Sequence, residues 1–408
     1  MCIRDRSYSD TAYFNFGSDS SFSGQKTAQG NADSGGVGDF YYEPPSGYLA
    51  LCTDNLSDPE IKLPGDNFNT VLWSGDDTDP HAITGVGFQP DFLWIKSRSA
   101  AKWHQQLDVI RGVTKQLNSN ETQAETTNSD KVKSFDTDGF TLGTRDEVNG
   151  SGETYVAWNW LGANGTATNE DGDITSTVSA NTTAGFSIAT YTGNNTDQAT
   201  IGHGLSQIPY LTIIKDRDNS STQWVINPYG AKLANYYGYF TTGSITADTS
   251  NVFFYDSTAS VVKLSNHAEV NASSTDYVMY NFHSVEGYSK IGSYIGNGST
   301  DGTFIYTGFR PAYTMTKNLA SAEGYTGWTI QDVKRAPYNI VTLGTMLSAD
   351  TDYVEGTRSQ GSASTIDYYD ILSNGFKMKN SSYETNQDGA TYLYIAFAEY
   401  PFKYAPAR

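Results

Sequence analysis

The sequence predicts an all-β protein, in which three tandem antiparallel β-sandwich modules of jelly-roll type follow a truncated N-terminal β segment. Composition is the first observation: the 408 residues include 39 Gly and 29 Tyr. Aromatic and β-branched residues suit a half-buried pleated strand, and Gly supplies the positive φ of tight turns. The second observation is a segment of about 100 residues that occurs three times, which is the size of a small domain. No window of the sequence shows a sustained helical period of apolar residues.

Each copy of the repeat opens on a strand with an aromatic residue followed closely by a Gly: Trp73 and Gly75, Tyr191 and Gly193, Tyr294 and Gly296. A Pro-led strand comes next, written FLWIK, LTIIK and YTMTK in the three copies. The spacing from the Pro to a Lys is identical in all three: Pro90 and Lys96, Pro209 and Lys215, Pro311 and Lys317. A Pro presets the entry into a strand and cannot donate to its ladder. We expect each Lys to lay its stem over apolar surface and to keep its ammonium in water.

The copies also end alike. A Trp follows each Lys, and the closing strands alternate large apolar and aromatic residues: Trp103, Trp224 and Trp328, then YVAWNW at 155, YVMYNF at 277 and YLYIAF at 392. Such strands suit a position between two packed faces, and antiparallel strands joined by short turns give a sandwich or jelly roll. The predicted modules are repeat 1 at 67–162, repeat 2 at 185–288 and repeat 3 at 289–404. Polar linkers are predicted at 54–66 and at 163–184.

The N-terminal part differs from the repeats. Residues 7–53 are rich in Gly, and their FNFG and PPSGYLALCT resemble the last strands of a SPRY or concanavalin-like sandwich whose front half is missing. Residues 1–6, MCIRDR, look like a non-native tag of the kind found in metagenomic reading frames, so we expect the natural chain to begin further upstream. Setting Cys2 aside with this tag leaves Cys52, for which we predict a packed thiol rather than a disulfide or a nucleophile.

Charge excludes some partners. The formal net charge is −19, and only 26 residues are Lys or Arg, without a basic cluster. A protein that binds a phosphate backbone needs such a cluster, so no nucleic-acid partner is predicted. No apolar run approaches the ~18 residues of a membrane span, so no membrane insertion is predicted.

With the repeats laid out, the chain resembles a family. The run GYSKIGSYIGNGSTDGTFIYTGFRPAYTMTK, with DILSNGFKMKN and YIAFAEYPFK near the end, is similar to a domain of marine bacteriophage virion proteins, described as a tail or appendage domain of unknown function and often preceded by a SPRY-like domain. The resemblance covers residues 7–402. It implies an extracellular virion structural protein, a tail fibre or appendage that contacts other virion proteins and faces the host surface. Tail fibres are commonly trimers, so a homotrimer is expected.

No catalytic residue comes with this resemblance, and we predict no enzyme. The five His residues show no metal-ligand spacing, and no metal or other cofactor is predicted. Calcium is the one cofactor with some support, because two acidic clusters could supply oxygen ligands, although solvated turns explain them better: Asp76, Asp77 and Asp79, and Asp171 with Asp173. A polysaccharide depolymerase would need two carboxylates across a cleft, and with 45 acidic residues candidate pairs are uninformative.

The candidate ligand-binding segment is NPYGAKLANYYGYF, residues 227–240. Its tyrosines could present flat faces to a host-surface polysaccharide: Tyr229, Tyr236, Tyr237 and Tyr239. The alternative, which we favour, is that alternating tyrosines line a strand packed on its neighbour. Three hypotheses for function therefore stand: a phage appendage, a secreted bacterial carbohydrate-binding protein, and a glycan hydrolase or lyase.

Overall fold

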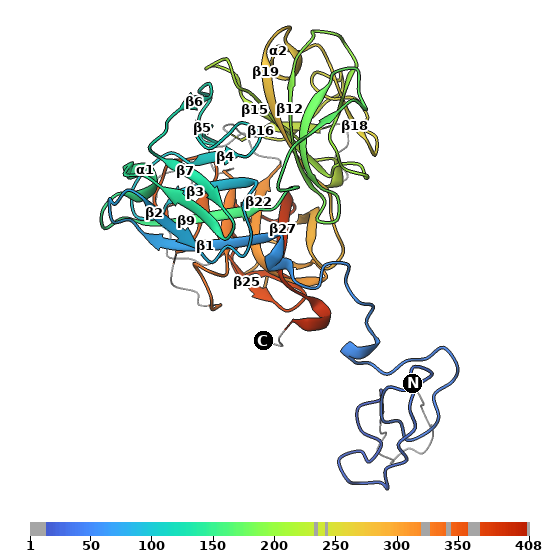
Figure 1. Ribbon diagram of the computed structural model, residues 1–408. Helices are drawn as coiled ribbons and strands as arrows, with labels where there is room; N and C mark the ends of the chain where they lie inside the picture. Colours follow the sequence, from blue (N-terminus) through green and yellow to red (C-terminus); the bar gives the residue numbers. More distant parts are fainter. Residues whose placement is uncertain are drawn as a thin grey trace. The chain divides into compact units, whose positions relative to one another are not determined.

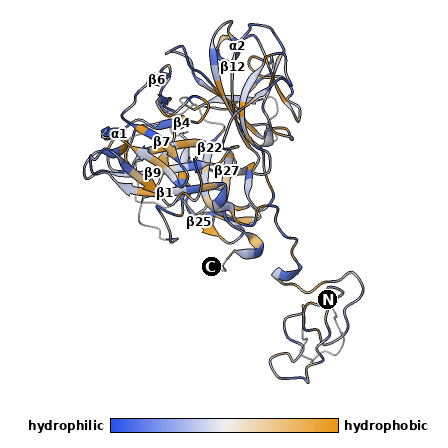
Figure 2. Cartoon of the chain, in the orientation of Figure 1, coloured by the Kyte–Doolittle hydropathy of each residue, from blue (hydrophilic) through white to orange (hydrophobic). Residues whose placement is uncertain are grey.

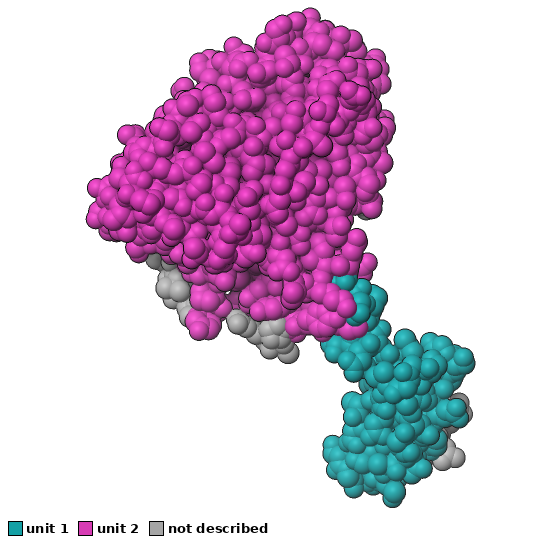
Figure 3. Space-filling model, in the orientation of Figure 1, with its two compact units in different colours: residues 1–59 teal, residues 60–408 magenta. Residues whose placement is uncertain are grey.

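The computed structural model describes residues 14–231, 236–240, 244–319, 327–339, 344–357 and 368–405. The chain divides into two compact units, residues 1–59 and residues 60–408 (Figure 3). The boundary falls inside the predicted linker 54–66. Residues 1–6, interpreted above as a tag, lie outside the described residues.

The described residues of the first unit, 14–59, do not form the strands that the sequence predicts. Residues 14–53 contain turns and one isolated bridge between Asn31 and Phe40, followed by the 3-10 helix η1 (Thr53–Asn55). The buried carboxylate of Asp33 organises this part, because it accepts hydrogen bonds from the backbone N–H of Ala50 and the side-chain amide of Asn55, both at 2.8 Å. Cys52 is exposed, so the prediction of a packed thiol is wrong.

Module 1 begins after the 3-10 helix η2 (Pro64–Asp66) and has two antiparallel sheets. The main sheet runs in the order β1 (Phe68–Ser74), β9 (Thr154–Trp160), β3 (Phe92–Ser97), β4 (Gln105–Asp108). The second sheet runs β2 (His81–Thr84), β8 (Gly139–Leu142), β7 (Val132–Asp136). The short strands β5 (Lys115–Gln116) and β6 (Thr126–Thr127) pair with each other, and α1 (Asp146–Asn149) is a single turn.

Module 2 repeats this plan. Its main sheet has the central order β12 (Phe186–Thr192), β19 (Asp276–Phe282), β14 (Leu211–Asp216), β15 (Trp224–Asn227). One edge continues into β11 (Ser176–Asn181) and β10 (Ala167–Asn169), and the other into β16 (Tyr236–Tyr239) and β17 (Thr246–Ala247). The second sheet pairs β13 (Ala199–Gly202) with β18 (Val261–Leu264), and the helical turns are η3 (Tyr229–Ala231) and α2 (Ala268–Asn271).

Module 3 has the same order again. Its main sheet runs β20 (Ser289–Ile295), β27 (Thr391–Pro401), β22 (Phe309–Asn318), β23 (Thr329–Asp332), β24 (Leu347–Ser348). The second sheet runs β21 (Phe304–Tyr306), β26 (Gly375–Met378), β25 (Tyr369–Leu372), and η4 (Phe402–Tyr404) follows β27. The fold class predicted from sequence is thus confirmed: the structure is all-β, with antiparallel sandwich modules (Figure 1).

The aromatic residue that opens each repeat is part of its module's own core. It stacks on the first residue of the closing motif, with ring centroids 5.4, 5.1 and 4.9 Å apart in the pairs Trp73–Tyr155, Tyr191–Tyr277 and Tyr294–Tyr392. The Gly two positions later passes against backbone of the turn before the closing strand: a Cβ at Gly75, Gly193 or Gly296 would lie only 2.2 to 2.3 Å from a carbonyl oxygen. The opening motif is therefore explained by packing and close backbone approach.

The prediction that residues 163–184 form a linker is wrong for the middle of this segment. β10 and β11 lie within it and extend the main sheet of module 2. Its composition is polar because β10 is exposed, but Ile174 and Val178 are buried in the core of module 2. Val178 lies in β11, whereas Ile174 lies between β10 and β11 and bridges Ile201 of β13 in the second sheet.

The three main sheets are buried on both faces. Along β9, Tyr155 and Ala157 pack in the core of module 1, whereas Val156, Trp158 and Trp160 point to the other face. The same alternation occurs along β19 and β27, and these second faces meet in one cluster, which we call the hub core. In Figure 2 apolar residues gather on the strands and the loops are mostly hydrophilic. The hub core takes buried residues from all three modules, including Phe92, Trp94, Trp158, Trp160, Phe186, Ile213, Trp224, Phe240, Tyr280, Phe282, Tyr313, Trp328, Ile395 and Phe397.

The hub core has a consequence for domain organisation. Residues 60–408 form one compact unit rather than three separate domains joined by linkers, because one face of each main sheet is buried against the other two modules in the hub core. The repeats mark structural modules and not independent folding units.

This predicts the effect of removing a hub side chain. Phe397 is 2% exposed and stacks on Phe68 of module 1 at 4.9 Å. Phe397→Ala is expected to lower the free energy of unfolding by about 3–5 kcal/mol. Chemical denaturation should still show one transition for all three modules, and the exposed Tyr338→Ala should change little. A variant in which module 3 melts apart from the other two would contradict the shared core.

Candidate functional site

The repeated polar residues of the chain lie where one module meets the next. We call the contact between two modules a seam. An equivalent backbone hydrogen bond forms at each of the three seams: Glu125 N–H to Arg217 O at 2.7 Å, Glu355 N–H to Arg98 O at 2.8 Å, and Ile245 N–H to Leu319 O at 3.3 Å. The first joins modules 1 and 2, the second modules 3 and 1, and the third modules 2 and 3. The modules therefore meet in cyclic order through equivalent positions.

The repeated lysines are buried at these seams, so the prediction that their ammonium groups lie in water is wrong. Lys96, Lys215 and Lys317 are at most 1% exposed. Lys96 Nζ donates to the carbonyls of Ser97 at 2.7 Å and of Asp352, in module 3, at 3.1 Å. Lys215 Nζ donates to Asp216 O at 2.8 Å and to Thr122 O, in module 1, at 3.3 Å. Burial lowers the pKa of Lys96 to about 7 and those of Lys215 and Lys317 to about 8.

The residue opposite each Lys is also a seam residue. Lys215 pairs with Trp224, and Ile95 pairs with Gln105, so His104 and not Trp103 is the counterpart of Trp224 in module 1. Trp103 is instead 45% exposed. The equivalence with Trp103 predicted from sequence is therefore wrong by one residue, because two adjacent candidates follow Lys96 and only the strand register separates them.

His104 and Trp224 both donate across a seam. Trp224 Nε1–H donates to Asn118 O, in module 1, at 2.9 Å. His104 Nδ1 accepts the indole N–H of Trp94 at 2.8 Å, which leaves the proton on Nε2, 2.9 Å from Ser348 O in module 3. Burial lowers the pKa of His104 to about 3, so the ring is neutral. At the third seam Trp328 stacks on Phe240 with centroids 4.7 Å apart.

A buried ion pair completes the first seam. Arg111 Nε lies 2.6 Å from Asp108 Oδ2, and both side chains are fully buried. The hydroxyl of Tyr280, in module 2, donates to the same carboxylate at 2.8 Å and accepts from Arg111 at 3.1 Å. Burial raises the pKa of the Tyr280 hydroxyl, which keeps its proton for this bond. Glu125 then joins Arg111 to Arg217 of module 2 at 3.2 and 2.9 Å.

The second seam has a matching buried Asp–Arg pair, and at the third seam apolar residues take its place. Asp332 and Arg335 pair at 2.5 Å, and Trp158 of module 1 takes the place of Tyr280, donating to Asp332 at 3.0 Å. Glu355 contacts Arg335 at 3.0 Å and Arg98 of module 1 at 2.7 Å. At the third seam the positions equivalent to Tyr280 and Asp108 carry Ile395 and Pro228, and Ile245 lies beside Leu319. The repeated polar groups thus serve assembly of the modules.

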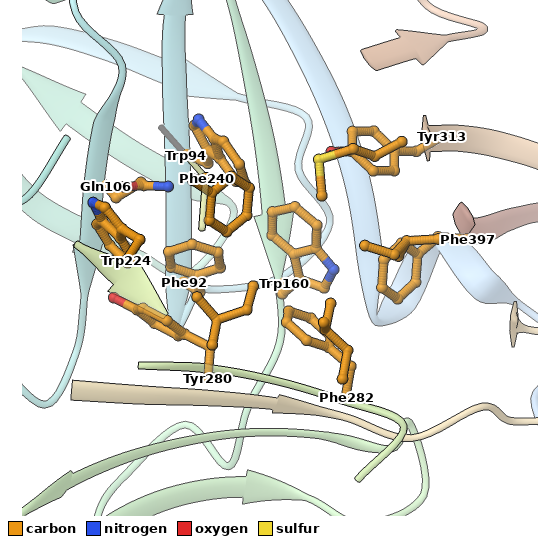
Figure 4. A pocket seen from close by; sticks show the side chains of 14 residues that line it. Phe92, Trp94, Gln106, Trp160, Trp224, Phe240, Tyr280, Phe282, Tyr313 and Phe397 are labelled. Carbon is orange, nitrogen blue, oxygen red and sulfur yellow. The ribbon is translucent and has the colours of Figure 1, made fainter. Parts of the chain in front are cut away.

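A small void lies where the three modules meet. It has a volume of about 20 Å³, room for about one water, and residues of all three modules line it. Figure 4 shows Trp160 between the aromatic rings of the other modules at this place. The buried lysines and His104 do not line it, and a void of this size is a small packing defect of the hub core.

A larger groove opens where the start of module 1 meets the end of module 3. Its volume is about 270 Å³, and its walls come from η2 and β1 on one side and from β22, β27 and the end of β23 on the other. This groove is the candidate binding site among the described residues. The lining residues are Lys62, Leu63, Pro64, Gly65, Asp66, Phe68, Asn69, Thr70, Ala312, Val333, Lys334, Ala398, Glu399 and Tyr400.

The tyrosines predicted to bind a ligand do not gather into one surface. Tyr236 packs against the hub core, whereas Tyr237 and Tyr239 lie on the opposite face of β16 against Phe253, at 4.8 and 6.0 Å. Tyr239 also donates to Glu269 at 3.3 Å. Tyr229 is half-buried in η3, and residues 232–235 of the segment lie outside the described residues. This arrangement agrees with the alternative of tyrosines lining a packed strand.

The acidic clusters have partners within the protein. Asp76 accepts from the backbone N–H and hydroxyl of Thr78, and Asp79 pairs with Lys133 at 2.7 Å. Asp173 accepts from Thr200. Among the described residues no group of three or more His, Cys, Asp or Glu side chains is placed to hold a metal ion. No helix in the described part of the chain is long and apolar enough to cross a membrane.

Fold and site together define an all-β protein of three sandwich modules around one shared core, with a surface groove at the junction of the first and last modules. The chain belongs to the DUF7483 family, a domain of unknown function, whose model matches residues 63–401. Neither a curated protein nor a solved structure matches the chain.

Sequence reasoning missed the Asp–Arg pairs and the groove. The pairs had a visible signal, since Asp108-Val-Ile-Arg111 and Asp332-Val-Lys-Arg335 occur at the same place in two copies. The groove had none, because its walls lie more than two hundred residues apart in the sequence.

The Tyr280 hydroxyl provides a test of the first seam. Tyr280→Phe removes its bonds to Asp108 and Arg111 and should lower the free energy of unfolding by about 1–3 kcal/mol, since a buried ion pair loses a partner. Tyr313→Phe is the matched control, because Tyr313 is equally buried in the hub core and its hydroxyl contacts the sulfur of Met315 at 3.6 Å rather than an ion pair. Equal losses in urea denaturation would argue against the seam.

The buried lysines predict a pH dependence. Folded Lys96 loses its proton near pH 7, whereas the unfolded chain keeps it to about 10.5, so between these values the unfolded state binds more protons and stability rises with pH. The slope from one such group is at most about 1.4 kcal/mol per pH unit. Lys96→Met should reduce the slope of unfolding free energy against pH between these values, and the exposed Lys334→Met should not. An unchanged slope in Lys96→Met would contradict the burial of Lys96 and indicate that its ammonium lies in water in the folded protein.

Proposed function

We propose that the chain is a structural protein of a phage virion, a tail fibre or appendage component that faces the host surface. One observation carries this proposal: the repeated polar groups are used at the seams between modules, as the pairs Lys96 with Asp352 O and Arg111 with Asp108 illustrate. The repeats then supply a rigid three-module body, and the surface is left for contact with partners. The family resemblance of the sequence to tail and appendage domains supports the same role.

The charge of the chain suits such a body. A net charge of −19 favours a dispersed, soluble surface and opposes non-specific self-association. Specific contacts with other virion proteins and with a host-surface polysaccharide, and a homotrimer of the whole chain, belong to the proposal.

Localisation tests the proposal directly. Antibodies raised against the full chain should label the tail region of purified particles in electron microscopy and should detect the chain among particle proteins. Light scattering of the full chain should give a trimer. The fibre role would be overturned by a strictly monomeric chain that is absent from particles and present in the medium of phage-free bacteria.

A secreted bacterial carbohydrate-binding protein is the second candidate, favoured by the surface groove with Tyr400 on its wall. The medium of phage-free cultures is where this candidate predicts the chain. A depolymerase is tested separately: release of reducing sugar from host polysaccharide by the full chain, abolished in Asp66→Asn, would replace the non-catalytic role.

A further inference from the structure

The groove at the junction of modules 1 and 3 has two features that the other copies of the repeat lack. The first is a β-bulge in β22. The register against β27 shifts on both sides of Pro311, and Ala312, which lines the groove, is left out of the ladder. In modules 1 and 2 the equivalent Pro90 and Pro209 precede their strands instead of lying within them. Bulges bend a strand locally and are common beside binding sites.

The second feature is an unpaired hydroxyl. Thr70 lines the groove, is 4% exposed, and its Oγ1 has no hydrogen-bond partner in the described part of the chain. Thr70 lies opposite Trp158 in the sheet of module 1. The equivalent residues are Ile188, opposite Tyr280 in module 2, and Ile291, opposite Ile395 in module 3. Two copies thus place an apolar side chain where module 1 places a hydroxyl. A buried polar group without a partner costs about 1–3 kcal/mol, which a ligand hydroxyl would recover.

The charged side chains that line the groove include equal numbers of lysines and carboxylates. Lys62 and Lys334 lie on its walls together with Asp66 and Glu399, in a chain whose net charge is −19. Glu399 is held by Arg310 at 2.5 Å. The walls can therefore donate and accept hydrogen bonds without favouring an ion of either sign, which suits a neutral ligand rich in hydroxyl groups.

The shape of the groove fits the same class of ligand. Tyr400 is 44% exposed and Leu63 is 66% exposed, so an aromatic face and an aliphatic side chain stand at the edge of the polar groups. The volume of about 270 Å³ lies just below the ~300 Å³ at which sites for drug-sized molecules begin. A sugar ring has an apolar face for Tyr400 and a rim of hydroxyls, each able to donate and to accept.

We propose that this groove binds a neutral sugar unit of a surface glycan, with Thr70 and Tyr400 as contact residues. This inference rests on the proposed host-facing role and names the ligand class and the site for it. Binding holds the sugar between the lead-in of module 1 and the last strand of module 3, so the ligand also bridges the two ends of the three-module body.

Saturation-transfer NMR on the full chain tests the proposal. The probes are free glucose, galactose, mannose and rhamnose, with glucuronate and glucose 6-phosphate as charged counterparts. At least one neutral sugar should show transfer and the charged ones should not. Thr70→Val, which keeps the shape and removes the hydroxyl, should weaken binding about tenfold. Because this hydroxyl is unpaired without ligand, the variant should be at least as stable as the wild type when no sugar is present.

Two tyrosine variants separate the groove from the rest of the surface. Tyr400→Ala should abolish transfer, and Tyr306→Ala, which removes another exposed tyrosine of module 3 outside the groove lining, should leave it unchanged. The inference is overturned if no neutral sugar shows transfer, if charged sugars bind as well, or if Tyr400→Ala and Tyr306→Ala bind the sugar equally. A dimer in light scattering that Tyr400→Ala converts to monomer would assign the groove to a second copy of the chain. If the sugar-binding tests fail, the proposed location of the chain on particles is unaffected. If the chain is absent from particles, the proposed sugar binding is unaffected.

Discussion

Along each closing strand, successive side chains point alternately to the module's own core and to the hub core, and the arrangement of modules depends on this two-sided burial. Tyr155 stacks on Trp73 within module 1, while its neighbours Trp158 and Trp160 pack against modules 2 and 3. A sheet with both faces apolar cannot remain exposed to water, so none of the three sandwiches is complete alone. The cyclic assembly gives all three second faces the same burial.

The hub core buries an equivalent face of every module, so it does not determine which module lies next to which. The polar contacts at the seams differ from one pair of modules to the next. Buried ion pairs contribute little net stability over apolar packing, and their clearest use is to select one arrangement over another. Asp108 and Asp332 each accept from a donor of the next module, Tyr280 or Trp158, whereas Ile395 at the same position of module 3 can donate nothing. Exchanging two modules would leave a buried carboxylate without its donor. The polar seams thus fix the order of modules around a largely aromatic centre.

The sequence was sufficient for the fold class and the repeat, because strand periodicity and turn residues are local signals. It was insufficient wherever a long-range partner decides the outcome. Lys96 has the ordinary pattern of a strand-end lysine, and only the carbonyl of Asp352 from another module explains its burial. Ile174 and Val178 are too few to predict a strand until the sheet of module 2 is present to pair with. The tyrosines of β16 show the opposite case, where alternation alone favoured the packed strand. The groove residues Thr70 and Tyr400 carry no signal at all in isolation.

The place of the groove follows from the same logic of repetition. A closed cyclic assembly of equal modules has equivalent seams, so any site built only from repeated residues would occur three times. The chain breaks this equivalence where it enters module 1 through η2 and where it leaves module 3 through the long strand β27. There Leu63 and Asp66 of the segment before β1 line a groove together with β22, whose register shifts on both sides of Pro311. Thr70 stands at a position where the other two modules place a hub-core isoleucine, so this departure from the repeat gives the groove a polar group that the other modules lack and is a position where binding specificity can develop.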